Sequence, residues 1–333
     1  MLKFTKNLIV LCVFVVTALG GAFAWVVFSP IQLKDSSIDF QIVPGSGLRV
    51  VARQIAEAGV SLDPWVFIVL GKLTRAEASI KAGSYEIDRG VTPFLLMRKL
   101  TRGDVTQTEI AFIEGWTFRQ MRDRLDAHPD VIHDTKDLSE AEILRRLNAS
   151  EVRAEGLFFP DTYLFSKRSS DLEVLGRAYR AMQNHLRQEW AGRAPGLPYR
   201  DPYQALTMAS IVEKETGRDQ DRPLVAAVFS NRLQQGMLLQ TDPTVIYGVG
   251  ENFDGNLRKR DLLADTPYNT YTRSGLPPTP IAMPGLASLQ AALHPAQTQV
   301  VYFVARGDGS SQFSRTLDEH NQAVTRYQKG GKR

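Results

Sequence analysis

A run of 21 residues without a charge, residues 8–28, constrains this chain more than any other feature. About 20 apolar residues, rising 1.5 Å each, are enough for a helix to cross a hydrocarbon core of roughly 30 Å. Lys3 and Lys6 precede the run, and such lysines stay on the cytoplasmic side of a membrane. The sequence therefore predicts a cytoplasmic tail over residues 1–7, a single-pass anchor, and an exported body after Pro30.

A cleaved signal peptide is the alternative to an anchor, because Ala22-Phe23-Ala24 has the A-x-A pattern of a cleavage site. The apolar run continues beyond this pattern to Phe28, as a spanning helix would, and this favours the anchor. Both interpretations place the body of the protein outside the cytoplasm.

The composition is that of a globular protein with a sizeable core, since 43% of residues are hydrophobic and 23% are charged. The net charge is only +4, and we find no dense basic helix with interleaved aromatic residues, so no nucleic-acid partner is expected. The single cysteine, Cys12, lies inside the apolar run. The chain can therefore form neither an internal disulfide nor a cysteine-based zinc site.

A loose repeat occupies residues 40–121. Each copy has a short extended segment, then a glycine, then apolar residues at helical spacing, and the glycines are Gly45, Gly90 and Gly115. A strand–glycine–helix unit of this length resembles the LysM carbohydrate-binding module, so residues 31–121 are expected to form a LysM-like α+β subdomain. Such units are also common α+β building blocks without a ligand, and the sequence leaves both interpretations open.

Residues 122–333 are expected to form a second α+β domain, and the whole chain is assigned to the α+β class. Asp201 as N-cap, Pro202 as first helical residue and Gly217 just past the end predict a helix over residues 202–216. The segment from Glu155 to Tyr163 is aromatic and broken by proline, which predicts a structured loop or an edge strand. Further helices are predicted over 139–147, 171–190 and 223–236, a strand over 299–305, and a capping box at Thr316 and Glu319.

Metal and nucleophilic chemistry are poorly supported by the sequence. The five histidines are scattered without an H-E-x-x-H pattern, and the chain has no Walker loop, no S-x-x-K and no G-x-S-x-G motif. We therefore expect no cofactor and no metal. Acid–base chemistry by carboxylates is what remains.

Glu213 is the carboxylate that stands out. It shares one face of the 202–216 helix with Leu206, Ala209 and Ser210, and it lies in the last turn. Partial burial and the negative end of the helix dipole both disfavour a charged carboxylate there, as a general acid requires. The small neighbours leave room for a ligand, although a glutamate near a helix end can also simply reach water.

Lys214 and Glu215 are turned away from the Glu213 face by about 100° and 200° at the helical repeat. Both are interpreted as solvent residues.

The residues around Glu213 also carry a resemblance to a known family. The chain from about residue 40 to residue 325 resembles the YceG-like (MltG-type) endolytic murein transglycosylases. The matching segments are, in order, 81–85, 156–163, 209–216, 231–233, 239–248, 268–271, 275–278 and 292–296.

The resemblance implies an enzyme of the cell wall, a lyase that acts within nascent glycan strands. It would cleave the β-1,4 bond between N-acetylmuramic acid (MurNAc) and N-acetylglucosamine, leave 1,6-anhydroMurNAc ends and so terminate strand elongation. The family's catalytic glutamate corresponds to Glu213. The resemblance further implies a single-pass anchor in the inner membrane, a catalytic domain over residues 122–333 in the periplasm, and peptidoglycan synthases of the elongation or division machinery as partners.

Further substrate-binding residues are expected in two segments with the polar and aromatic types that recognise sugars. Asp242 is either a second carboxylate that stabilises an oxocarbenium charge or a turn residue before Pro243, and that proline argues against an interior strand. The aromatic candidates are equally well explained as core tyrosines. The full set is Gln240, Thr241, Asp242, Thr244, Tyr247, Asn269 and Tyr271.

Two other functions compete with the transglycosylase. One is a two-carboxylate glycoside hydrolase of peptidoglycan with Glu213 as acid and Asp242 as its partner. The other is a non-catalytic wall-binding scaffold protein in which residues 40–121 make the functional contacts.

Overall fold

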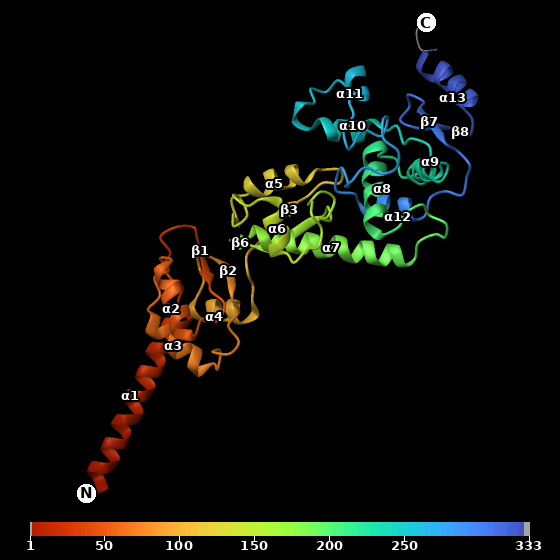
Figure 1. The fold of residues 1–333 in the computed structure, drawn as a ribbon. Coiled ribbons are helices and arrows are strands. Elements are labelled where there is room, and N and C mark those ends of the chain that lie inside the picture. The colour runs from red at the N-terminus through yellow and green to blue at the C-terminus, as the bar shows by residue number, and fades with distance from the viewer. Residues whose placement is uncertain (1, 330–333) are drawn as a thin grey trace. The chain divides into compact units, whose positions relative to one another are not determined.

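The computed structural model describes residues 2–329, and the fold is a mixture of helices and short strands, so the α+β class is confirmed (Figure 1). The chain divides into two compact units. The first consists of Met1–Glu109 with Leu164–Ser169, and the second consists of Ile110–Tyr163 with Ser170–Arg333. Residues 110–121, which the sequence places with the first subdomain, thus pack within the second unit.

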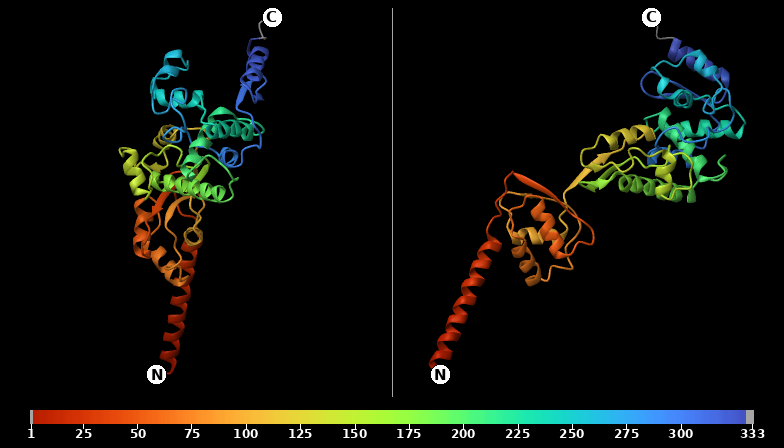
Figure 2. Two further views of the ribbon diagram at one scale, coloured as in Figure 1. Left: turned by 45° about the vertical axis from the view of Figure 1, so that its right-hand side comes forward. Right: turned by 60° about the vertical axis from the view of Figure 1, so that its left-hand side comes forward.

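Helix α1 (Leu2–Phe28) begins the first unit. Its stretch from Lys6 to Phe28 is long and apolar enough to cross a membrane. Figures 1 and 2 show no other element of the first unit beside its N-terminal part, whereas Phe28 packs on Phe94 with ring centroids 5.2 Å apart. The backbone N–H of Ile31 donates to the carbonyl of Val91 at 2.8 Å. The end of α1 is therefore fastened to the first unit.

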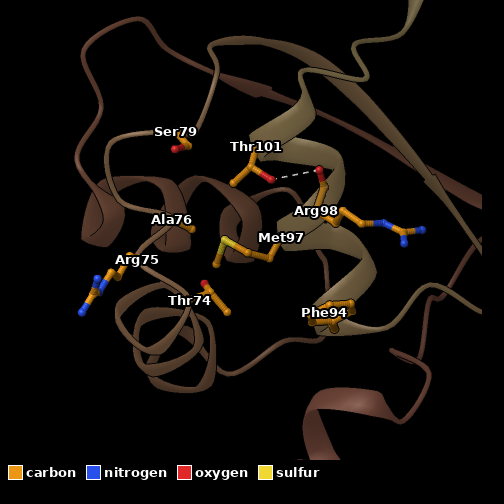
Figure 3. Close-up of a pocket in the computed structure, with 8 residues that line it drawn as sticks. All are labelled: Thr74, Arg75, Ala76, Ser79, Phe94, Met97, Arg98 and Thr101. Atoms are coloured by element: carbon orange, nitrogen blue, oxygen red, sulfur yellow. Dashed lines mark hydrogen bonds between the residues drawn. The ribbon is translucent and has the colours of Figure 1, made fainter.

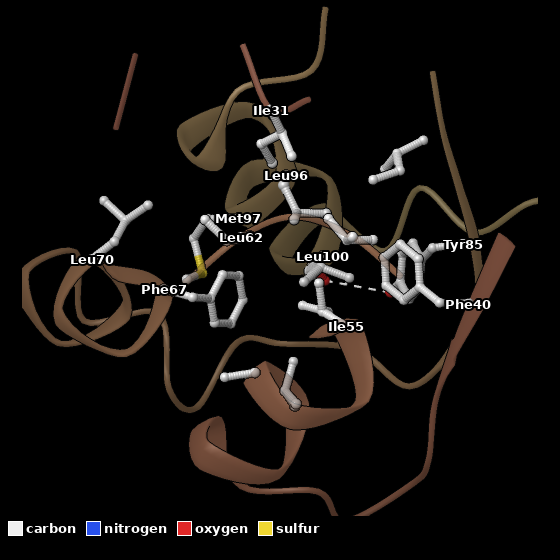
Figure 4. Packing of buried hydrophobic residues seen from close by; sticks show 14 of the residues in the cluster. Ile31, Phe40, Ile55, Leu62, Phe67, Leu70, Tyr85, Leu96, Met97 and Leu100 are labelled. Atoms are coloured by element: carbon white, nitrogen blue, oxygen red, sulfur yellow. Dashed lines mark hydrogen bonds between the residues drawn. The ribbon is translucent and has the colours of Figure 1, made fainter. Parts of the chain in front are cut away.

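The rest of the first unit packs three helices and an antiparallel strand pair around one core. Strand β1 pairs with β2 in the register Ser37↔Asp88 to Ile42↔Gly83. Figure 4 shows the core, in which Phe67, Leu96 and Leu100 are fully buried and the Tyr85 ring lies next to Phe40. The elements are β1 (Ser37–Ile42), α2 (Leu48–Glu57), α3 (Pro64–Leu73), β2 (Gly83–Asp88) and α4 (Pro93–Arg102).

The predicted strand–glycine–helix repeat is present in all three copies. β1 precedes α2, β2 precedes α4, and β3 (Gln107–Ala111) precedes α5 (Phe118–Asp126), with Gly45, Gly90 and Gly115 at positive φ between them. Helix α3 is not part of the pattern. Its sequence is apolar on almost every side and so carries no helical period, although Asp63 caps it and Pro64 opens it.

The second unit is mostly helical. The helices predicted over 139–147, 171–190, 202–216 and 223–236 are present within two residues of these bounds, whereas the helices over 242–249, 259–263 and 286–293 were not predicted. The capping box at Thr316 and Glu319 is confirmed, and the strand predicted over 299–305 is shorter. Its helices are α5, α6 (Glu140–Arg146), α7 (Asp171–Ala191), α8 (Pro202–Glu215), α9 (Arg222–Gln234), α10 (Asp242–Val249), α11 (Lys259–Leu263), α12 (Leu286–Leu293) and α13 (Leu317–Val324).

Short two-stranded pairs complete the architecture. β3 pairs with β5 (Thr162–Ser166), β4 (Val131–Ile132) pairs with β6 (Ser169–Ser170), and β7 (Tyr302–Ala305) pairs antiparallel with β8 (Ser311–Ser314). A 3₁₀ turn over Gly250–Asn252 and a π-helical turn over Thr325–Lys329 follow α10 and α13.

Helix α8 is the centre of the second unit. Helices α7, α9, α10 and α12 pack around it, and every residue from Ala205 to Val212 is buried (Figure 1). The proposal that Ala209 and Ser210 leave room for a ligand is therefore wrong. The Ser210 hydroxyl accepts a hydrogen bond of 3.0 Å from the N–H of Ile281, because the proline-rich segment after residue 276 lies against this part of the helix.

Candidate active site at the end of helix α8

Glu213 lies at the point where the buried helix reaches the surface. Asp201 caps α8 by accepting the N–H of Gln204 at 2.9 Å, and the helix ends at Glu215 because Thr216 is extended. Glu213 is half-buried in the last turn. Its Oε2 accepts the N–H of Gly285 at 3.1 Å, and Gly285 is the N-cap of α12. A carboxylate is thus held at the positive end of a second helix.

The loop before α5 joins the site through its backbone. The N–H of Gly115 donates to the carbonyl of Met283 at 2.8 Å, and the N–H of Met283 donates to the carbonyl of Trp116 at 2.7 Å. Lys214, which is exposed as predicted, donates to the carbonyl of Gly115 at 3.1 Å. Gly115 has φ +76°, a conformation that favours glycine, so the turn after Glu114 is built for this contact.

The same loop brings the Glu114 carboxylate next to Gly285. The carboxylate occupies the space that a Cβ on Gly285 would need. Burial raises the pKa of Glu114, and the negative charge of Glu213 raises it further. Two carboxyl groups therefore meet at the start of α12.

Glu215 does not face solvent, and the sequence-based interpretation is wrong here. It is half-buried, and the hydroxyl of Thr241 donates to its carboxylate. Burial raises the pKa of Glu215 to about 7, although the Thr241 hydrogen bond acts in the opposite direction. The reason is tertiary, because α10 packs against the side of α8 that helical spacing alone leaves free.

The segment around residue 240 lies next to the end of α8, where Thr241 contacts Glu215, and part of the segment is structural. Gln240 is exposed at φ +51°, and its N–H donates to the carbonyl of Thr270 at 3.1 Å. Thr241 and Thr244 are buried, and the Thr244 hydroxyl lies 2.9 Å from that of Thr270. These hydroxyl groups hold the start of α10 in place.

Asp242 is the first residue of α10, so Pro243 opens a helix and the segment is not a strand. Asp242 is exposed and accepts the Tyr271 hydroxyl at 2.5 Å. Asn269 is fully buried, and its amide group donates to three backbone carbonyls between residues 261 and 264. Asn269 therefore fastens the α11 loop, whereas Asp242 and Tyr271 remain at the surface of the site.

Tyr247 is bound to a carboxylate that sequence reasoning missed. Its hydroxyl donates to Oε2 of Glu155 at 3.1 Å, and the other oxygen of Glu155 accepts the N–H of Phe118 at 2.9 Å. Glu155 is 7% exposed, and burial raises its pKa to about 7 against these two hydrogen bonds. Through these two hydrogen bonds, the buried Glu155 side chain connects the start of α5 to α10.

The sequence held a partial signal for two of the three missed glutamates. Glu114 and Glu155 each precede a glycine, Gly115 and Gly156, and both glycines have positive φ in the structure. Nothing in the pattern around Glu215 indicates its contact with Thr241, because the two residues come from different helices.

Other features of the described residues have no link to Glu213. Figure 3 shows a pocket of about 310 Å³ in the first unit between the end of α3 and α4, and no acidic side chain lines it. Asp126, His133 and Asp171 bring possible metal-ligand atoms within 4.8 Å of one another. One carboxylate oxygen of Asp171 already accepts two hydrogen bonds from Thr135, and we assign no metal to this group.

Comparisons with known proteins agree over most of the chain. The model of the YceG-like family matches residues 40–326. An endolytic murein transglycosylase of Bacillus subtilis strain 168 is 33% identical over an alignment of 339 positions, which covers 93% of this chain and 91% of the relative. One from Streptococcus pneumoniae D39 is 24% identical over 86% of this chain and 57% of its own length. A crystal structure of a YceG-like protein from Listeria monocytogenes covers 86% of this chain and 98% of its own at 29% identity, with a TM-score of 0.54.

Proposed function

The chain belongs to the YceG-like family, and from this we propose that it is an endolytic murein transglycosylase, a lyase that cleaves peptidoglycan within its glycan strands. The bond broken is the β-1,4 link between MurNAc and N-acetylglucosamine, and the product end is 1,6-anhydroMurNAc. Cleavage of this kind ends the elongation of a nascent strand.

Glu213 carries the proposed chemistry as acid and then as base. Its protonated carboxyl donates to the glycosidic oxygen as the bond to C1 of MurNAc breaks. The resulting carboxylate then takes the proton of the C6 hydroxyl of MurNAc, and the C6 oxygen closes onto C1. The substrate supplies its own nucleophile at a high effective concentration, so one carboxyl can serve both steps.

The observation that supports this most is the hydrogen bond from Gly285 to Glu213. A backbone N–H at a helix start stabilises the carboxylate that exists between the two steps, at a fixed position. Asp242, Gln240, Tyr247 and Tyr271 remain proposed sugar contacts. Thr241, Thr244 and Asn269 are buried, and their hydrogen bonds hold the start of α10 and the α11 loop in place.

The chemical nature of the new glycan ends distinguishes the three candidate functions. Peptidoglycan sacculi treated with the full-length chain in detergent should yield new 1,6-anhydroMurNAc ends by mass spectrometry, with no added metal or cofactor. New reducing ends would instead identify a two-carboxylate hydrolase. Binding to sacculi without new ends of either kind would identify a wall-binding scaffold protein.

We also propose that the protein is held in the cytoplasmic (inner) membrane by residues 8–28, with residues 1–7 inside the cell and the catalytic domain of residues 122–333 outside it. Its partners are then the glycan strands, the membrane and the peptidoglycan synthases of elongation or division. The LysM-like role of residues 31–121 belongs to the same proposal, which is supported by the strand–glycine–helix copies and by a pocket without acidic side chains.

Anchoring predicts that the intact N-terminus is recovered with the membrane. Membrane fractions should contain the full-length chain after washing with high salt or alkali, because a spanning helix is released only by detergent. A soluble form that begins at Trp25 would show that the segment is a cleaved signal.

A further inference from the structure

Helix α1 packs into the first unit along its last turns and not only at its end. Val27 is 3% exposed, and Phe23 packs against the same buried cluster as Val27. Phe28 lies on Phe94 of α4, and α1 also contacts α3. Because a helix rises 1.5 Å per residue, the stretch from Phe23 to Phe28 covers about 7.5 Å of the helix axis. The first unit therefore reaches down beside the apolar run over this distance.

The exposed part of α1 below Phe23 is too short to cross a membrane by itself. Residues 7–22 are exposed throughout, and these 16 residues rise about 24 Å. A hydrocarbon core is roughly 30 Å thick, and a tilted helix crosses less of that thickness. With Lys6 at the cytoplasmic surface, the outer boundary of the core then falls within residues 23–28. Since these residues pack against the first unit, its neighbouring surface lies at the depth of the lipid headgroups.

The surface at this depth carries exposed apolar side chains. Phe94, which touches Phe28 of the anchor, lines the pocket of Figure 3 together with residues at the end of α3. Leu73 at the end of α3 is 69% exposed, and Leu95 beside Phe94 is also exposed. Trp25 of α1 is exposed as well, and tryptophan is enriched at membrane–water interfaces. Such side chains are stabilised when they enter the boundary between headgroups and acyl chains.

Two arginines stand beside these apolar side chains. Arg75 and Arg98 line the same pocket, and Figure 3 shows them extending outward from its opposite sides. Neither forms an ion pair with any residue that the structure describes, and no acidic side chain lines the pocket. A guanidinium group binds phosphate oxygens through two N–H groups at once. Apolar side chains flanked by arginines are typical of a surface that binds an anionic membrane.

We propose that the first unit is docked on the outer surface of the membrane through the end of α3 and the start of α4. Leu73 and Leu95 enter the boundary between headgroups and acyl chains. Arg75 and Arg98 bind the phosphate groups of anionic phospholipids. This inference rests on the proposed anchoring of residues 8–28. It goes further, because a single-pass anchor alone does not fix the height of the exported body above the bilayer, whereas docking does.

A fluorescent label at Leu73 tests the docking in the full-length chain. Cys12 is the single cysteine, so Cys12→Ser combined with Leu73→Cys carries one label at the exposed end of α3. In vesicles of phosphatidylcholine and phosphatidylglycerol, lipids with brominated acyl chains should quench most of its emission. Val43→Cys is the matched control, because Val43 is also exposed but lies past the far end of β1, about 20 Å along the strand from the end that follows the anchor. Its label should keep its emission.

Arg75→Gln combined with Arg98→Gln tests the contact with the headgroups. Each arginine near an anionic membrane surface strengthens binding about fivefold. The pair of changes should therefore lower the ratio of docked to free first unit about 25-fold, as reported by the Leu73 label. In vesicles of phosphatidylcholine alone the same changes should have little effect. Arg124→Gln combined with Arg187→Gln alters the net charge equally at exposed positions of the second unit and should leave the quenching unchanged.

A label on the native Cys12, which is exposed on α1, separates the inference from the anchoring on which it rests. A quenched Cys12 label with an unquenched Leu73 label overturns the docking and leaves the anchoring intact. An unquenched Cys12 label overturns the anchoring itself. Quenching at Leu73 that the two arginine changes do not reduce, or that soluble glycan fragments of peptidoglycan abolish, overturns the assignment of the arginines to phospholipid.

Discussion

Glu213→Gln should reduce the formation of 1,6-anhydro ends by at least about 10³-fold, near the upper end of the 10²–10⁴-fold range for general acid–base catalysis. The amide keeps the shape of the side chain and can still accept the Gly285 N–H, but it has no proton to donate to the glycosidic oxygen. The loss is large because one group serves both half-steps. The measurement is mass spectrometry of the ends released from sacculi, with folding checked by circular dichroism.

Two further variants test whether the loss of activity is specific to Glu213. Glu189→Gln should keep the wild-type rate, because Glu189 contacts α12 through Gln290, on another part of the helix from Gly285. Asp242→Asn keeps an acceptor for the Tyr271 hydroxyl, so it should cost much less than Glu213→Gln. If Glu213→Gln keeps more than about a tenth of the wild-type activity, the loss is smaller than general acid–base catalysis supplies. Glu213 is then not the acid and base of the reaction. Equal losses at Asp242 and Glu213 would favour the two-carboxylate hydrolase.

Glu155→Gln should stabilise the second unit at pH 8 relative to the wild type and have little effect at pH 5. A carboxyl whose pKa is about 7 in the folded state and 4.5 when unfolded stabilises the fold fully only below pH 4.5. That contribution is lost as pH rises through 7, because the buried group must then give up its proton. The difference is about 3 kcal/mol at 1.36 kcal/mol per pKa unit, and glutamine has no proton to lose.

Thermal unfolding of the full-length chain at pH 5 and pH 8 measures this difference as a change of several degrees in the transition of the second unit. Glu215→Gln should act in the same direction, because burial also raises the pKa of Glu215 to about 7. Glu173→Gln, on the exposed side of α7, is the control and should keep the wild-type difference between the two pH values. If Glu155→Gln is less stable than the wild type at pH 8, Glu155 is charged and paired in the folded protein.

Local signals predicted the helices that carry capping residues and a clear period. Asp201 and Pro202 fix the start of α8, and Thr316 with Glu319 fixes the start of α13, because caps involve residues only two or three positions apart. Helix α3 escaped the periodicity argument because it is apolar on nearly every side.

The sequence predicts the position of a site residue only relative to other residues of the same helix. Helical spacing places Glu213 in the last turn of α8, but the same spacing assigned Glu215 to solvent and left Ser210 open. Thr241 and Ile281 decide those two positions, and both come from segments that pack on α8 from elsewhere in the chain. Glu114 and Glu155 gain their surroundings in the same way, through contacts that no periodic pattern records.

The backbone hydrogen bonds between Gly115, Trp116 and Met283 can form only after the later segment has been synthesised. Glu114, Glu213 and Gly285 leave the ribosome in that order, so a growing chain contains both glutamates before the amide that binds Glu213 exists. Domains fold as units while the chain emerges. A chain that stops before Gly285, or loses its C-terminal part to a protease, keeps Glu213 but has no helix start to bind it. The hydrogen bond between Gly285 and Glu213 can therefore form only after most of the chain has been synthesised.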